Sequence, residues 1–404
     1  MQALVWLALY STFGIARVGY WFFDLSDIAY YYEEGALRIA QGLVPFRDFL
    51  LVYPPLFAPL VVLPGVNVSE KTYFFRFAFL MIASMTAACA VTALAVRDRE
   101  ARWRPYVVAA VFAACTLVLG PITANRYDAT VALVLALTLF FMARARWLAV
   151  AVTIGVGFAL KITPAVLLPL ALVLAPRNQW WRMLAGFSAA AVIPFLLVLG
   201  SGHDAATNLS EMLAYHLGRP LETESVLATP LWIGRLLGLT TVQVGVVAGS
   251  QSIVSATSTL IAKGSVGVLV AALGGVLALV WRRREAIVAN VELQFLAVLA
   301  TLLASLVGSK VLSPQYFVWI IPAVALVAID RRVLGALLAV VLLLTQVEFP
   351  ANYWAFAQFQ QPGAVAIVVI RNLVLVAAFA LSLWHLWRIP EPTPSRAKGR
   401  VRKR

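Results

Sequence analysis

The chain has 404 residues, of which 62% are hydrophobic and only 12% are charged, with a formal net charge of +14. This composition excludes a water-soluble domain, because so few polar residues cannot cover its surface. The positive charge does not indicate nucleic-acid binding either, since the arginines gather in short loops between apolar stretches.

Apolar stretches that can cross roughly 30 Å of hydrocarbon recur along the chain and predict an all-α polytopic membrane protein. We expect one membrane domain over residues 1–388 with about twelve spans. The predicted spans are residues 4–20, 73–96, 106–119, 129–142, 148–160, 164–175, 184–199, 265–281, 287–307, 316–329, 333–347 and 364–387. The first stretch lacks a charged start and a cleavage site, so it is predicted to remain as a span.

The basic residues predict how these spans are oriented. They cluster in short loops, at residues 97–104, 144–146, 177–182, 282–284 and 331–332. The positive-inside rule places such loops in the cytoplasm, together with both termini. A basic, proline-containing tail at residues 389–404 is predicted to be disordered and cytoplasmic. The chain is therefore expected in the cell membrane, with the long loops 22–72 and 200–263 on the outer face.

The first outer loop is neither a span nor a polar connector. Residues 27–41 place apolar side chains on one helical face and charged ones on the other, and Gly42 fits a helix stop. An amphipathic helix directly after a span should lie in the membrane interface. Its carboxylates would then lie at the depth of lipid phosphates.

A carboxylate at that depth could act as a general base, taking the proton from an acceptor hydroxyl. Asp24, Asp27 and Asp48 are the candidates. Each has a purely structural alternative, because Asp24 or Asp27 could cap the interfacial helix and Asp48 could pair with Arg47. The spacing alone does not choose among them.

Five segments, in this order, carry a resemblance to a known family. They are DIAYYYEEGALRIAQGLVPFRDFLLVYPP (27–55), NRYDATVALVLAL (125–137), ALKITPAVLLPLAL (159–172), YHLGRPLETESVLATPL (215–231) and SPQYFVWIIP (313–322). Together they resemble the GT-C superfamily of membrane glycosyltransferases, and within it glycosyltransferase family 87, mannosyltransferases typical of actinobacteria.

The resemblance implies a GT-C-like fold and a polyprenyl-phosphate sugar donor, usually polyprenyl-phosphomannose. It also implies inversion at the anomeric carbon and an acid of the first outer loop as base. Asp27 occupies the matching position, and Asp24 is the second choice because the superfamily often has two acids there. The acceptor, a glycolipid or a polysaccharide, stays open, as does an arabinose donor, which related families use.

A phosphate leaving group needs positive charge and hydrogen-bond donors. The outer segments offer Arg126, Lys161, His216, Arg219 and Lys310. The alternative for the two lysines is snorkelling toward headgroups, and for His216 and Arg219 it is a solvated loop.

Five further residues in the matched segments are candidates for substrate binding. They are Tyr53, Asp128, Glu224, Gln315 and Tyr316. Asp128 could instead cap a helix, and Tyr316 could belong to the aromatic belt of the membrane boundary.

No pattern typical of a metal site or a nucleotide cofactor stands in a credible context, so we expect neither. The expected partners are the lipid-linked donor, the acceptor and the membrane. The competing interpretation is a transporter or flippase of lipid-linked sugars, although internal repeats and midplane charges typical of transporters are not evident. A membrane scaffold would give no reason for the acidic loop.

Overall fold

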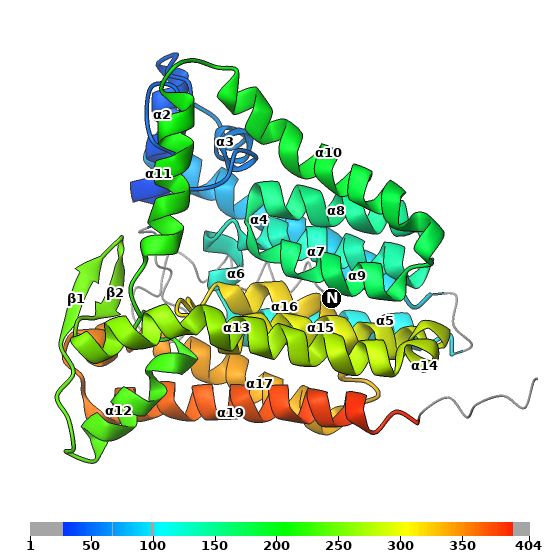
Figure 1. Ribbon diagram of the computed structural model, residues 1–404. Coiled ribbons are helices and arrows are strands. Elements are labelled where there is room, and N and C mark those ends of the chain that lie inside the picture. Colours follow the sequence, from blue (N-terminus) through cyan, green and yellow to red (C-terminus); the bar gives the residue numbers. More distant parts are fainter. Residues whose placement is uncertain (1–26, 67, 98–100, 391–404) are drawn as a thin grey trace, which may run out of the picture.

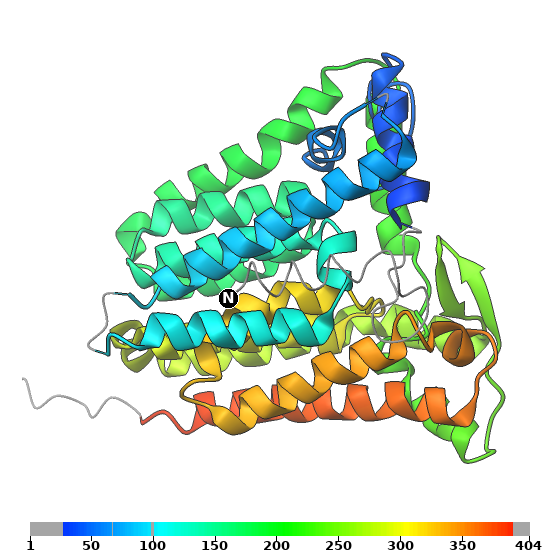
Figure 2. The same cartoon turned by 180° about the vertical axis from the view of Figure 1, so that it is seen from behind.

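The computed structural model describes residues 27–66, 68–97 and 101–390. Long helices run side by side through the molecule, and short helices and a hairpin gather at one end (Figures 1 and 2). The long helices are α4 (Glu70–Leu94), α5 (Arg104–Leu119), α7 (Asp128–Ala143), α8 (Trp147–Leu160), α10 (Trp180–Leu199), α13 (Ala256–Arg282), α15 (Val291–Gly308), α16 (Tyr316–Val327), α17 (Arg332–Glu348) and α19 (Pro362–Trp387).

Shorter elements connect them. These are η1 (Ile28–Glu33), α2 (Glu34–Ala40), α3 (Phe57–Val62), α6 (Ile122–Asn125), η2 (Thr163–Val166), α9 (Leu167–Leu174), η3 (Arg177–Gln179), α11 (Ala205–Gly218), η4 (Val226–Ala228), α12 (Thr229–Leu236), β1 (Val244–Val247), β2 (Ser250–Ile253), α14 (Arg284–Ala289) and α18 (Tyr353–Ala357). The predicted span at residues 4–20, the candidate Asp24 and residues 391–404 of the predicted tail lie outside the described residues.

Many of the helices suit a membrane. Within the described ranges, five are long and apolar enough to cross it: α4, Arg177–Leu199 with α10, α13, α15 and α19. Further apolar helices, among them α5, α7, α8 and α16, are shorter. The chain is therefore a helical membrane protein, and the expected number of about twelve spans stays a prediction.

Local capping explains where several helices begin. The Ser69 side chain accepts a hydrogen bond from the Thr72 N–H at the start of α4. Ser255 and Ser258 form a reciprocal capping box, so α13 begins at Ala256, well before the predicted residue 265. Asn290 has extended backbone and caps α15, which divides the predicted span 287–307 into α14 and α15.

The core of the bundle lies around α15 and α16. Helix α15 packs against α13, α16 and α19, while α16 packs against α5 and α7. In α15, 83% of the most apolar window is buried, compared with 11% in the Arg177–Leu199 helix and 17% in α13. Helices α10 and α13 therefore form an apolar outer surface that lipid would cover.

The described chain is mostly helical, as predicted, and a short β-hairpin is added to the helices. Strands β1 and β2 pair antiparallel, with Val244 opposite Ile253 and Val247 opposite Ser250. The two-residue turn between them has positive φ at Ala248 (50°) and Gly249 (69°), the geometry that joins twisted strands tightly. The sequence predicts only a loop here, because both strands are short and lie within the long outer loop 200–263.

At the hairpin end, α2 and α11 run across the ends of the long helices (Figure 1). Helix α2 continues directly from η1, so residues 28–40 are helical. Gly42 (φ 84°) follows the last turn of α2. Asn208 Nδ2 on α11 donates to the Phe46 carbonyl oxygen at 2.6 Å, which joins α11 to the first loop. This end holds the candidate site.

Candidate active site

A cavity of about 370 Å³ opens at the hairpin end of the bundle. Its wall combines the first loop, the segments that precede α7 and α12, the hairpin, and the segments around α16 and α18. The lining residues are Asp27, Tyr31, Tyr53, Arg126, Tyr215, Arg219, Glu222, Glu224, Val246, Gly249, Ser250, Gln251, Ser313, Pro314, Gln315, Phe349, Tyr353 and Trp354. Of the predicted site residues, Asp27, Tyr53, Arg126, Arg219, Glu224 and Gln315 are thus brought together.

Asp27 and Arg126 form an ion pair in the wall of this cavity. Asp27 Oδ2 lies 2.8 Å from Arg126 Nε, and the two side chains are 21% and 3% exposed. Asp27 immediately precedes η1, but its side chain makes no capping hydrogen bond. The alternative role of Asp27 as a helix cap is therefore not observed. Arg126 has extended backbone between α6 and α7, and its Nη1 donates to the Asn125 carbonyl oxygen at the end of α6 at 3.1 Å. The pair holds a carboxylate beside the cavity space.

Asp48, the other described candidate for the base, behaves differently. Asp48 Oδ2 lies 2.7 Å from Arg47 Nη2 and also accepts from the Val44 N–H at 2.7 Å. These hydrogen bonds, from Arg47 first, lower the pKa of Asp48 to about 2. Asp48 does not line the cavity and closes the turn at residues 44–48.

A second buried arginine enters the cavity from the segment after α11. Arg219 Nη2 lies 3.3 Å from Glu222 Oε1, with side chains 13% and 3% exposed. Glu222 is also held by the Leu312 N–H (2.7 Å) and the Ser313 hydroxyl (3.2 Å). Arg219 is therefore anchored through Glu222 to the SPQY segment, while its guanidinium faces the cavity.

A buried ionic network lies next to the cavity. Glu224, in the cavity wall, is only 2% exposed to solvent. Its backbone carbonyl accepts from Arg371 Nη2 at 2.7 Å, and its Oε1 lies 3.7 Å from Arg371 Nη1. Glu348 Oε2 lies 3.2 Å from the same Nη1. Arg371 thus joins α19, the end of α17 and the loop before α12.

Lys161 lies in an aromatic cage and not in the cavity lining. Its Nζ donates to Asp128 Oδ1 at 2.6 Å, and it sits 4.7 to 4.8 Å from the ring centroids of Tyr127, Tyr316 and Trp319. The Trp319 indole N–H donates to the same Asp128 oxygen. Cation–π contacts and the ion pair compensate the burial of this lysine. The structure thus places three predicted residues, Lys161, Asp128 and Tyr316, together beside the cavity.

His216 and Lys310 bind backbone groups. His216 Nε2 is 2.8 Å from the Val52 carbonyl oxygen, joining α11 to the first loop. Lys310 Nζ donates to the Leu217 carbonyl oxygen at 2.6 Å. Neither lines the cavity, although both lie on segments that shape it.

The burial of His216 is expected to make the stability of the folded chain depend on pH. Burial lowers the pKa of His216 below its ordinary 6.5, and the charges of Arg219 and Lys161 lower it further against the hydrogen bond to Val52. Below pH 6.5 the unfolded chain takes up a proton that the folded chain resists, so this contribution to stability is present above that pH and lost as pH falls.

We therefore expect His216→Gln, which keeps a donor for Val52, to reduce the fall in thermal unfolding midpoint between about pH 7 and pH 5. The exposed His203 supplies the control variant His203→Gln. An identical pH profile in wild type and His216→Gln would contradict this role.

Several lining residues were not predicted. Tyr215 Oη donates to the Ala248 carbonyl oxygen at 2.7 Å, so α11 holds the hairpin against the cavity. The hairpin in turn brings Ser250 and Gln251 into the wall. Tyr215 stands in a matched segment, whereas nothing in the sequence marks the two hairpin residues.

No group of three or more His, Cys, Asp or Glu that could hold a metal ion occurs in the described part of the chain. The cavity wall holds three carboxylates, of Asp27, Glu222 and Glu224, together with two arginines, aromatic rings and side-chain amides. The arginines suit an anionic group of a ligand, and the carboxylates and amides suit its hydroxyl groups.

The comparison with protein families decides between the interpretations. The model of glycosyltransferase family 87 matches residues 51–314. The chain belongs to glycosyltransferase family 87. No curated protein matches it. The matched range includes Arg126, Arg219 and Glu224, while Asp27 and Gln315 fall outside it. This family 87 member is therefore a membrane glycosyltransferase, as its segments predicted.

Proposed function

We propose that this family 87 protein transfers mannose from a polyprenyl-phosphate donor to a hydroxyl of a lipid or polysaccharide acceptor, with inversion. The observation that carries the proposal is the placement of Asp27 and two arginines, Arg126 and Arg219, on the wall of one cavity. A base and a phosphate-binding pair are the minimum that the reaction requires.

In the proposed reaction, Asp27 takes the proton of the acceptor hydroxyl as its oxygen attacks the anomeric carbon. The bond between that carbon and the phosphate oxygen breaks, and the polyprenyl phosphate leaves with the electron pair. Arg126 and Arg219 would stabilise the charge that develops on this phosphate. The two guanidinium groups would supply the positive charge in this proposal, which involves no metal ion.

The proposed orientation follows from the charge distribution. The basic residues at 101–104, 282–284 and 331–332 all lie at the end of the bundle away from the cavity (Figures 1 and 2). The positive-inside rule would place that end in the cytoplasm and the cavity at the outer face. Helix α2, lying across the bundle end, would then rest in the interface where donor phosphates lie.

The test is a transfer assay with purified protein in vesicles that contain polyprenyl-phosphomannose, read by mass spectrometry of the acceptor lipids. Comparing glycolipids of cells with and without the gene identifies the acceptor, as a hexose missing from one species. Movement of intact lipid-linked sugar across the vesicle without any transfer would instead support a flippase.

We expect Arg219→Gln to raise KM for the donor by about 10- to 100-fold, because a charge-assisted hydrogen bond to the phosphate is lost. Donor titrations in the same assay measure it. Arg47→Gln, an exposed arginine of the outer loop, is the control with the same charge change. An unchanged KM in Arg219→Gln would remove this residue from the donor site.

A further inference from the structure

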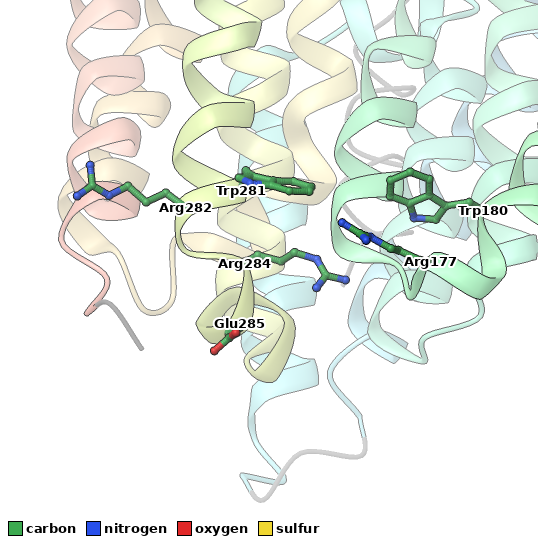
Figure 3. A pocket seen from close by; sticks show the side chains of 6 residues that line it. All are labelled: Arg177, Trp180, Trp281, Arg282, Arg284 and Glu285. Carbon is green, nitrogen blue, oxygen red and sulfur yellow. The ribbon is translucent and has the colours of Figure 1, made fainter. Parts of the chain in front are cut away.

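A second cavity, of about 410 Å³, lies at the opposite end of the bundle. It is formed by η3 and the start of α10 on one side, and by the end of α13 and α14 on the other (Figure 3). Its lining is Arg177, Trp180, Trp281, Arg282, Arg284 and Glu285. Nothing in the proposed sugar transfer uses these residues.

Two arginines face each other across this cavity. In Figure 3, Arg284 extends toward Arg177, whereas Arg282 and Glu285 point away from the gap. Arg284 Nε donates to the Val173 carbonyl oxygen at 2.6 Å and its Nη2 to the Ala175 carbonyl oxygen at 3.1 Å. The end of α9 thus holds this guanidinium in place. Within the described ranges, neither Arg177 nor Arg284 has an ion-pair partner.

The two tryptophans add a donor and a boundary. The Trp180 Nε1–H is buried without a hydrogen-bond partner in the described structure, which leaves a costly unsatisfied donor. Trp281, 54% exposed, lies in the last turn of α13. Tryptophan at a helix end is typical of the headgroup level of a membrane.

The cavity also lies between the two most exposed apolar helices. Near the cavity, Trp181 in the first turn of α10 is 82% exposed, and Val270, further along α13, is 64% exposed. A molecule seated among the arginines would therefore have apolar helix surface beside it, suited to acyl chains.

We propose that this cavity binds the headgroup of an anionic phospholipid. The phosphate would sit between Arg177 and Arg284 and accept the Trp180 N–H, while the acyl chains follow α10 and α13. A zwitterionic lipid carries its own ammonium group, which these arginines would repel. The site is independent of the sugar chemistry at the other end.

The test is native mass spectrometry of the purified full-length protein in detergent, titrated with phosphatidylglycerol or phosphatidylcholine. Wild type is expected to retain one phosphatidylglycerol in preference to phosphatidylcholine. Arg177→Gln should weaken phosphatidylglycerol binding about fivefold, and Trp180→Phe, which keeps an aromatic ring and removes only the donor, should weaken it also. Arg332→Gln, at an exposed arginine outside this cavity, is the control with the same charge change.

Equal retention of both lipids, or unchanged phosphatidylglycerol affinity in Arg177→Gln and Trp180→Phe, would overturn the proposal. Displacement of the lipid by millimolar inorganic phosphate would overturn it too, by showing a site for free anions. Thermal unfolding midpoints equal to wild type establish that the variants fold. If Arg177→Gln does not fold, the affinity of Trp180→Phe decides.

Discussion

Asp27→Asn is expected to lower the rate of sugar transfer by about 10²- to 10⁴-fold, the usual contribution of a positioned general base. The amide has nearly the shape of the carboxylate, and its oxygen can still accept from Arg126, which lies 2.8 Å from Asp27 in the ion pair. The variant should therefore fold and bind donor while it cannot take the acceptor proton. The change should appear in kcat and leave the donor KM near that of wild type.

The measurement is turnover of polyprenyl-phosphomannose by purified protein in vesicles. Asp48→Asn is the matched control, because Asp48 stands in the same loop but pairs with Arg47 and does not line the cavity. Asp24→Asn runs in parallel as the second candidate. Near-normal turnover by Asp27→Asn reassigns the base, to Asp24 if that variant alone is inactive.

The cavity-lining residues that stand in recognisable sequence segments could be predicted from the sequence. Asp27, Arg126 and Arg219 each stand in a segment with a recognisable pattern outside the apolar spans. The helices followed from apolar stretches, and their ends differed where capping decided them, as at Ser255 and Asn290. A periodicity of hydrophobic residues does not report such caps, because one hydroxyl or amide sets the boundary.

The interaction partners of the buried charged residues could not be predicted from the sequence. Lys161 and Asp128 are 33 residues apart, and Glu224 and Arg371 are 147 apart, so only the packing of the helices brings each pair together. A lone lysine at the end of a span predicts snorkelling equally well. The three rings around Lys161 come from two other segments of the chain. Tyr127 precedes Lys161, whereas Tyr316 and Trp319 lie far behind it in the sequence.

Arg371 illustrates the same limit. An arginine inside a span predicts a functional or paired group, without naming the partner. The structure supplies Glu348 at 3.2 Å, the Glu224 carbonyl at 2.7 Å and the Asn372 side-chain oxygen at 3.1 Å. All of these groups are almost completely buried. The network thus connects the wall of the candidate-site cavity to the two helices α17 and α19.

Arg371→Leu is therefore expected to lower the free energy of unfolding by about 3–5 kcal/mol, because it leaves the buried Glu348 without its cationic partner and removes the shorter of two hydrogen bonds to the Glu224 carbonyl. The apolar side chain suits the surrounding bundle, so the loss reports the uncompensated charge and not a cavity. Thermal and denaturant unfolding in detergent measure it. Arg332→Leu, at an exposed position, should change stability by less than about 0.5 kcal/mol.

The double variant Arg371→Leu with Glu348→Leu separates the two contributions. If the penalty comes from an unpaired carboxylate, removing that carboxylate as well should recover a large part of the lost stability, since apolar replacements of whole buried pairs are often neutral. If the double variant is as unstable as Arg371→Leu alone, the important contacts are those to Glu224, whose carbonyl accepts from Arg371 at 2.7 Å and whose Oε1 lies 3.7 Å from Arg371 Nη1. A decrease in the free energy of unfolding of less than about 1 kcal/mol in Arg371→Leu would contradict both explanations, because removing one member of a buried ion pair is expected to destabilise the protein by more than that.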